Sequence, residues 1–486
     1  MIAWSVFAVG GVYVWAGAPL MVAGAVLAVV ARPQPGTSRE TQALDGLLLA
    51  VVAAAALQVV PLPSAVRAAI APHLDGIRSA MYVGPTDMAR WWPLSLAPGW
   101  TAYSLGLLIT ALVVFWTTRR ACGLGLSLRI VRHVAFVGLV AALVALAEQA
   151  AGDPTLIYGR WQARDAGARP FGPFVNRNHF ATWVLMACPL AAGYVAAVLS
   201  VRRPAPALRA KLVALLEGLG TSELWVGVAG AVMTLALAVS TSRSGLLAFG
   251  VSLVGGAWLA RSRLTARALG FGVLAVIVLG AFMATYVDVQ PLLSRVDETL
   301  VVGAGGRPRV WQETLRLIRD VWLTGTGLGS YQSAMLVYQQ TNRTVFINQA
   351  HNQYLHFLAE GGVLLTAPAL MAVVAFIRLF RVRLAQDTSA FVWLRIGGGA
   401  AILAVAVQGL WETGLRMPAN GLLFAIAAAV AVHRPTRPRA AREEDGVGEE
   451  AGCEGAFRSG RPYGGSPCAR ARQHGVEAPS NAARVH

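Results

Sequence analysis

Long apolar runs, separated by short loops that carry arginine, fill most of this 486-residue chain. Most runs are about 17–25 residues long, which lets a helix cross the roughly 30 Å hydrocarbon core of a bilayer. The pattern therefore predicts an all-α polytopic membrane protein. The runs lie at residues 2–31, 44–60, 100–117, 130–149, 178–199, 224–240, 245–260, 268–287, 353–377, 394–411 and 418–432.

The first run leaves the number of spans open. Residues 2–31 are interrupted by Gly10-Gly11 and by Gly17-Ala18-Pro19, so they form either one long span or two short ones. Counted as two, they bring the total to about twelve transmembrane helices, with both termini in the cytoplasm. A large periplasmic loop, residues 288–352, then lies between the ninth and tenth spans.

The number and the distribution of charged residues support this topology and indicate a membrane protein rather than a soluble one. The chain is 56% hydrophobic and 13% charged, and its net charge of +17 is almost entirely arginine because Lys211 is the only lysine. Soluble domains carry roughly 25% charged residues, so we expect a membrane protein with no nucleic-acid partner. Basic residues gather in cytoplasmic loops, which places residues 61–99, 150–177 and 288–352 on the outer side.

The chain divides into a membrane part and a tail. Residues 1–433 hold all the apolar runs, whereas residues 434–486 are rich in Arg, Glu, Gly and Pro. Such a composition is typical of disorder, and we expect a disordered cytoplasmic tail. The N-terminus has no basic region or cleavage pattern, so no removable signal peptide is expected. The four cysteines show no metal-binding or disulfide spacing.

The stretch from Gly305 to Gly362 is the only long, mostly polar interval within the membrane part. Residues 308–322 have the periodicity of an amphipathic helix, which can lie at the membrane interface. Arg307 stands at the N-terminus of this helix, where backbone N–H groups and the helix dipole also favour an anion. The glycine-rich residues 323–331 follow no strand, so an irregular turn is expected there rather than a nucleotide-binding loop.

Arginines on the outer side are candidate anion ligands, because the positive-inside rule disfavours them there. Arg243 lies in a tight turn between two apolar helices, where a charge is costly and usually functional. With Arg307 and Arg309 it could clamp a diphosphate, since guanidinium groups bind phosphate bidentately. Any one of them could instead be a solvated loop charge. The supporting candidates on this side are Arg177, Asn178, His179 and Arg316.

His351 opens the next apolar helix, directly after the arginine-rich interval. It could simply cap that helix, but a neutral imidazole suits proton removal from a hydroxyl near pH 7. His351 is therefore the candidate general base, and Asn352 could orient it or the acceptor. Glu360, about two and a half turns further on, is expected to be a buried hydrogen-bonding partner. The outer segments hold no acidic cluster of the kind that binds a metal, which favours a reaction without metal or cofactor.

Five segments together resemble the O-antigen ligase family, which is related to O-antigen polymerases and bacterial O-oligosaccharyltransferases. Each segment alone is a weak signal, but their order is specific and covers roughly residues 170–365. In chain order they are GPFVNRNHFA (172–181), STSRSGLLAF (240–249), GGRPRVWQETLRLI (305–318), LTGTGLGSY (323–331) and AHNQYLHFLAEGG (350–362).

The resemblance implies a GT-C-type membrane glycosyltransferase that uses a glycan on undecaprenyl diphosphate. It would transfer the glycan to an acceptor hydroxyl at the outer face of the bacterial inner membrane, with inversion and without a metal. By the same resemblance, the essential histidine is His351 and the phosphate-binding arginines are Arg243 and Arg307. Pro308 directly after Arg307 departs from the simplest form of the motif, which leaves open whether Arg307 or Arg309 contacts phosphate.

Three functions remain open at this point. The acceptor could be lipid A-core or a second lipid-linked glycan, as in a ligase or a polymerase. It could be a protein, as in an O-oligosaccharyltransferase, whose core motifs look the same. A transporter of lipid-linked glycan would carry polar or broken helices near the bilayer midplane, whereas the polar residues here gather at one face. The sequence leaves the glycan, the acceptor and the oligomeric state unspecified.

Overall fold

The computed structural model describes residues 1–434 apart from several gaps. The predicted span at 268–287, the first part of the predicted periplasmic loop and the predicted disordered tail therefore lie outside the described residues. The gaps are residue 34 and residues 82–90, 152, 154, 165–167, 202–220, 265–269, 271–280, 282–306, 341, 342, 344 and 345.

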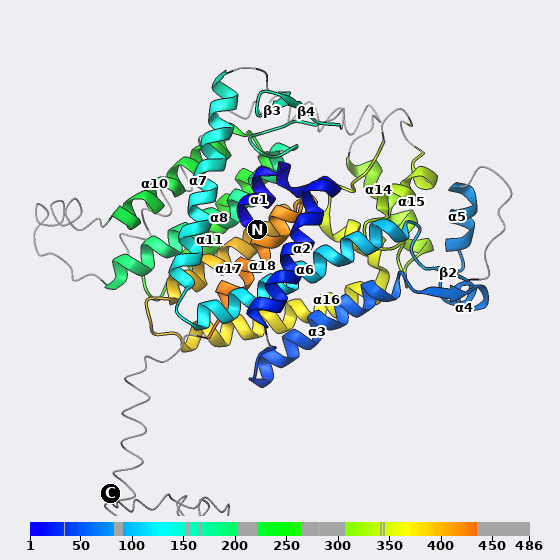
Figure 1. Cartoon of the computed structure of the whole chain (residues 1–486), viewed down its shortest axis with the longest axis horizontal. Helices are drawn as coiled ribbons and strands as arrows, with labels where there is room; N and C mark the ends of the chain where they lie inside the picture. Colours follow the sequence, from blue (N-terminus) through cyan, green and yellow to red (C-terminus); the bar gives the residue numbers. More distant parts are fainter. Residues whose placement is uncertain are drawn as a thin grey trace, which may run out of the picture. The chain divides into compact units, whose positions relative to one another are not determined.

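The described residues form a helical bundle with two small two-stranded antiparallel sheets, β1–β2 and β3–β4 (Figure 1). The elements are α1 (Ile2–Phe7), η1 (Val9–Gly11), α2 (Val14–Ala31), α3 (Arg39–Leu57), β1 (Pro61–Pro63), α4 (Ser64–Ile70), α5 (Leu74–Met81), β2 (Trp91–Pro93), α6 (Pro98–Gly123), α7 (Ser127–Ala151), β3 (Leu156–Ile157), β4 (Trp161–Gln162), α8 (Arg177–Val201), α10 (Thr221–Val239), α11 (Arg243–Ala260), α14 (Arg307–Asp320), α15 (Tyr331–Tyr338), α16 (Gln353–Gln386), α17 (Val392–Gln408), η2 (Gly414–Arg416) and α18 (Pro418–Val432).

Seven of the described helices are long and apolar enough to cross a membrane, namely α2, α3, α6, α7, α8, α11 and α16. Three shorter apolar helices, α10, α17 and α18, accompany them. This confirms the prediction of an all-α polytopic membrane protein. The count of twelve spans is not confirmed.

The first apolar run forms one candidate span rather than two. Helix α1 has six residues and therefore rises only about 9 Å, too little to cross a bilayer. The chain then turns at Gly10 and Gly11, whose φ angles are +67° and +74°. A Cβ atom on Gly10 would lie 2.9 Å from the ring of Phe174, so the turn is packed against the bundle. Only α2, which follows, is long enough to span.

Helix α8 is the centre of the bundle. Its residues from His179 to Ala191 are all buried, as expected for a helix that is apolar on every side. It packs against α7, α10, α11, α17 and α18, and Figure 1 shows α8, α17 and α18 in the middle of the bundle. A Cβ atom on Gly193 would lie 2.5 Å from the carbonyl oxygen of Trp393. The backbones of α8 and α17 are therefore in close contact, as small residues permit in membrane bundles.

The glycine-rich segment after α14 braces a break in α16. Gly362 has φ +55° and ψ −163°, which interrupts the helical hydrogen bonds. The N–H of Val363 donates to the carbonyl of Trp322 at 2.8 Å, and the N–H of Gly327 donates to the carbonyl of Glu360 at 2.9 Å. The segment is thus an irregular turn, as predicted, and it satisfies backbone groups that the break leaves free.

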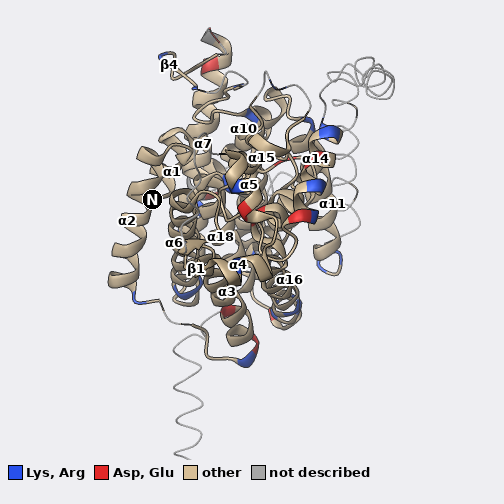
Figure 2. Cartoon of the chain, turned by 90° about the vertical axis from the view of Figure 1, so that its right-hand side faces the viewer, with Lys and Arg blue, Asp and Glu red and all other residues tan. Residues whose placement is uncertain are grey.

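The segments with an outer assignment meet at one end of the bundle and those with an inner assignment at the other. At the first end, Arg177 donates to Thr241 and thereby joins α8 to the turn before α11. At the second end, Arg120 donates to the carbonyl of Ala31 and joins α6 to α2. Figure 2 shows blue ribbon at the lower ends of α3 and α16 and again around α14. The compartment that each end faces stays a prediction.

The break in α16 gives a prediction about stability. A Cβ atom on Gly362 would lie 2.5 Å from the backbone nitrogen of Gly325, in a left-handed conformation that L residues rarely adopt. We expect Gly362→Ala to lower the Tm of the detergent-solubilised protein by several degrees, since such strain costs about 1–3 kcal/mol. Gly250→Ala is the matched control, because a Cβ atom there meets nothing within 4 Å. Equal Tm values for the two variants would contradict this account of the break.

Candidate functional site

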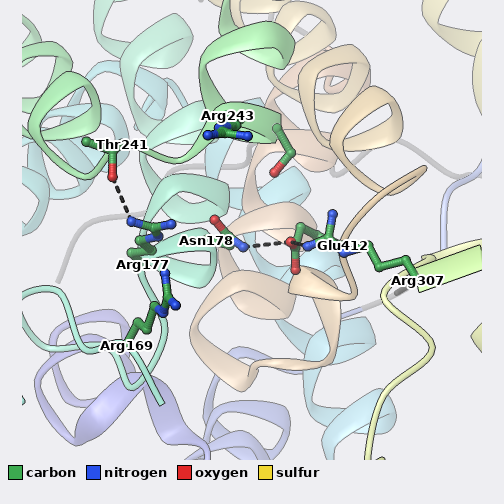
Figure 3. Close-up of a pocket in the computed structure, with 8 residues that line it drawn as sticks. Arg169, Arg177, Asn178, Thr241, Arg243, Arg307 and Glu412 are labelled. Carbon is green, nitrogen blue, oxygen red and sulfur yellow. Dashed lines mark hydrogen bonds and ion pairs between the residues drawn. The ribbon is translucent and has the colours of Figure 1, made fainter. Parts of the chain in front are cut away.

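A buried carboxylate joins the predicted site residues. Glu412 lies in the link between α17 and η2, and its side chain is 1% exposed. Its Oε1 atom accepts hydrogen bonds from Arg307 Nη2 and Asn178 Nδ2, both at 2.6 Å (Figure 3). Its Oε2 atom lies 3.7 Å from His351 Nδ1. Three segments that are far apart in the sequence therefore meet at one carboxylate.

The environment of Glu412 keeps this carboxylate charged. Burial alone would raise its pKa, but the adjacent His351 ring and the guanidinium of Arg307 together lower the pKa below the usual glutamate value. Glu412 is consequently ionised at neutral pH. Its negative charge is stabilised by a cation on one oxygen and faces an imidazole with the other.

Arg307 and Glu412 also border an open cavity of about 450 Å³ at this end of the bundle. Its lining contains four arginines and one carboxylate, so the cavity is positive and suits an anion. Figure 3 shows the arginine side chains on both sides of Asn178 and Glu412. The lining residues are Arg169, Arg177, Asn178, Thr241, Arg243, Ser244, Arg307 and Glu412.

The turn before α11 places Arg243 at this cavity. Ser242 caps α11 by accepting a hydrogen bond from the N–H of Gly245, and its hydroxyl donates to Asn178 Oδ1 at 2.7 Å. Thr241, at φ +50°, accepts from Arg177 at 2.7 Å. These bonds fix the turn against the start of α8. Within the described part of the chain, Arg243 itself has no hydrogen-bond or ion-pair partner, so its donors are available to a ligand.

The backbone on both sides of His351 is held in place. His351 has φ +50°, a left-handed conformation that is uncommon outside glycine and concentrated at functional sites. Before it, the carbonyl of Ala350 accepts from Trp311 Nε1 at 2.9 Å, and the N–H of Ala350 donates to His356 Nδ1 at 3.3 Å. After it, the side chain of Asn352 caps α16 by accepting from two backbone N–H groups at 3.0 Å.

Glu360 belongs to a second, buried group behind the site. Its side chain is 3% exposed and lies 3.2 Å from His356 Nε2. It also accepts from the N–H of Tyr331 at 3.1 Å and lies 3.7 Å from Arg416. This is the buried hydrogen-bonding position that the sequence predicted. Because His356 also accepts from Ala350, the group supports the backbone that carries His351.

Six of the predicted site residues are not among those that line the cavity: His351, Asn352 and Glu360, described above, and Arg309, Arg316 and His179. Arg309 is exposed and does not line it, because residues two apart on a helix point in nearly opposite directions. Arg316 is exposed and donates to Gln340. His179 is 4% exposed, inside α8. The cavity therefore favours Arg307 over Arg309 as the arginine that meets a ligand.

Glu412 was not among the site residues predicted from the sequence, although its position in the chain indicates a functional role. It is the only acidic residue between Asp387 and Glu443, and it lies in a five-residue link between two apolar helices, 409–413. A charge in such a place is usually functional. Arg169 and Thr241 were not singled out either. In the part of the chain with described coordinates, no group of three or more His, Cys, Asp or Glu side chains is placed to hold a metal ion.

Comparison with known proteins shows which family part of the chain resembles. No curated protein matches the chain. A family model described as O-antigen ligase matches residues 228–370, a range that contains Arg243, Arg307 and His351, while Glu412 lies beyond it. The matched residues supply two of the cavity arginines and the histidine that faces the buried carboxylate. This part of the chain is thus similar to the O-antigen ligase family.

Proposed function

We propose that this protein transfers a glycan from an undecaprenyl-diphosphate carrier to an acceptor hydroxyl, at the periplasmic face of the bacterial inner membrane. The family match indicates a membrane glycosyltransferase of the ligase or polymerase type. The observation that carries the finer proposal is the arrangement around Glu412. One of its oxygens binds an arginine of a positive cavity, and the other faces a histidine.

The cavity fits the diphosphate of such a donor. Its volume of about 450 Å³ lies within the range of small-molecule sites. Arg243 has its donors available, and Arg307 uses Nη2 for Glu412, which leaves further N–H donors of its guanidinium for phosphate. Two guanidinium groups would neutralise the charge that develops on the diphosphate as it leaves, so little help from an acid is needed.

His351 is the proposed general base. The acceptor oxygen forms a bond to the anomeric carbon while the bond from that carbon to the diphosphate oxygen breaks on the opposite face, which gives inversion. The hydroxyl proton passes to the imidazole. With Nδ1 directed at Glu412, Nε2 is the nitrogen left to accept it. The separation of 3.7 Å exceeds a hydrogen bond, and such contacts commonly tighten when substrate binds.

The location of the site supports an enzyme over a transporter. A transporter of lipid-linked glycan would hold its polar site near the middle of the spans, whereas Glu412 lies in a link between two helices at one end of the bundle. A polymerase or a protein O-oligosaccharyltransferase would use the same donor site with another acceptor. Assays of the purified protein with lipid A-core, a second lipid-linked glycan and a protein acceptor separate these three.

The donor clamp is tested with arginine variants. We expect Arg243→Ala and Arg307→Ala to lower glycan transfer by at least about thirtyfold, since loss of a charge-assisted contact costs roughly 2–5 kcal/mol. Arg→Lys should restore little, because a bidentate contact is lost. The matched control is Arg309→Ala, two residues from Arg307 and outside the cavity lining, which should stay within about twofold of wild type. An Arg309→Ala loss as large as that of Arg307→Ala would overturn the assignment.

The general base is tested with His351→Ala. We expect this variant to fold, to bind donor and to lose transfer, because the group proposed to take the acceptor proton is missing. A chelator should leave the wild-type rate unchanged. His73→Ala, an exposed histidine on the same side, is the control and should be fully active. An active His351→Ala enzyme would move the base elsewhere, and a variant that cannot bind donor would make His351 part of the clamp.

A further inference from the structure

A second cavity, of about 340 Å³, lies at the opposite end of the bundle. It is formed by the start of α3 and by the last turns of α6, α16 and α18. Helix α18 begins beside the Glu412 cavity and has 15 residues, so the two cavities are separated by roughly 20 Å. The lining residues are Gly36, Thr37, Ser38, Thr41, Trp116, Arg119, Arg120, Gly123, Arg383, Val432 and Arg434.

The buried acid beside this cavity is already neutralised. Asp45 is 1% exposed, and its two oxygens accept from the two terminal nitrogens of Arg119 at 2.8 and 2.6 Å. Trp116 Nε1 donates to the same carboxylate at 2.9 Å, as does the N–H of Gly36 at 2.7 Å. The charges of Asp45 and Arg119 cancel each other. The carboxylate therefore leaves the charge of the other lining arginines uncompensated.

Three further arginines, Arg120, Arg383 and Arg434, keep the cavity positive. Arg120 donates to the backbone carbonyls of Ala31 and Arg32, so its charge is not offset there by an acid. Arg383 has a buried Nε atom that, among the described residues, has no hydrogen-bond partner. Figure 2 shows the basic ribbon at this end of α3 and α16. The N-terminus of α3, capped by Ser38, adds to the positive potential of the cavity. The exposed carboxylate of Glu40 offsets part of that potential.

An apolar surface adjoins these cations. Val29 and Val30, at the end of α2, are 72% and 76% exposed, next to the Ala31 carbonyl that Arg120 contacts. A ligand with a phosphate in the cavity could therefore lay hydrocarbon against α2. We propose that this cavity binds the phosphate of an anionic phospholipid headgroup, at the membrane surface opposite the Glu412 site. Basic pockets between transmembrane helices are known to hold such headgroups.

The site is tested by lipid binding to the full-length protein in detergent. Dioctanoyl phosphatidylglycerol should bind, detected by native mass spectrometry and by a rise in Tm, and dioctanoyl phosphatidylcholine should bind far more weakly. Arg383→Gln should weaken phosphatidylglycerol binding by about tenfold, because one charge-assisted hydrogen bond is lost. Its Tm without lipid should stay near the wild-type value, since no internal bond of Nε is broken.

The matched control is Arg381→Gln, an exposed residue on the same helix with the same change of charge. It should bind phosphatidylglycerol as wild type does. An equal loss in both variants, or equal binding of phosphatidylcholine, would overturn the proposed anion site. Inorganic phosphate is the third arm. If it displaces phosphatidylglycerol at equal concentration, the cavity takes free phosphate and the lipid assignment is wrong.

Discussion

The carboxylate of Glu412 is ionised and almost completely buried, and the rest of the site depends on how its charge is compensated. An isolated charge away from water is unstable unless it is paired and hydrogen-bonded. Here Arg307 and Asn178 bind one oxygen at 2.6 Å. That requirement fixes the start of α14, the start of α8 and the link after α17 relative to one another. The cavity that we propose for the donor is a consequence of this arrangement.

The same carboxylate connects the two chemical roles in the proposed reaction. Arg307 borders the anion cavity, and His351 faces the other oxygen of Glu412. His351 needs a rigid support because its backbone is in a left-handed conformation, and Trp311 and His356 provide this by binding Ala350. Behind them, the break in α16 at Gly362 is braced by the glycine-rich turn. The strained backbone at His351 is thus held in place by the hydrogen bonds of the backbone groups around it.

The sequence predicted the features that arise from local patterns. Apolar runs located most helices to within a few residues, and the ordered motifs located Arg243, Arg307 and His351. The role of Glu412 depends on contacts across 61 positions or more in the chain, which no local pattern reports. The choice between Arg307 and Arg309 depends on the rotational phase of α14, which was visible only once the neighbouring helices were in place. The first apolar run was ambiguous because glycine pairs permit either a kinked span or a tight turn.

The most direct test of the central claim is the rate of transfer at saturating donor by Glu412→Gln, in protein whose thermal unfolding matches wild type. Glutamine keeps the size of the side chain and removes the charge that faces His351 and Arg307. If Glu412 positions the base as well as the clamp, this maximal rate should fall by at least about tenfold, because misplacing a general base is costly even when donor is bound. An unchanged maximal rate, with at most a weaker affinity for donor, would contradict the account.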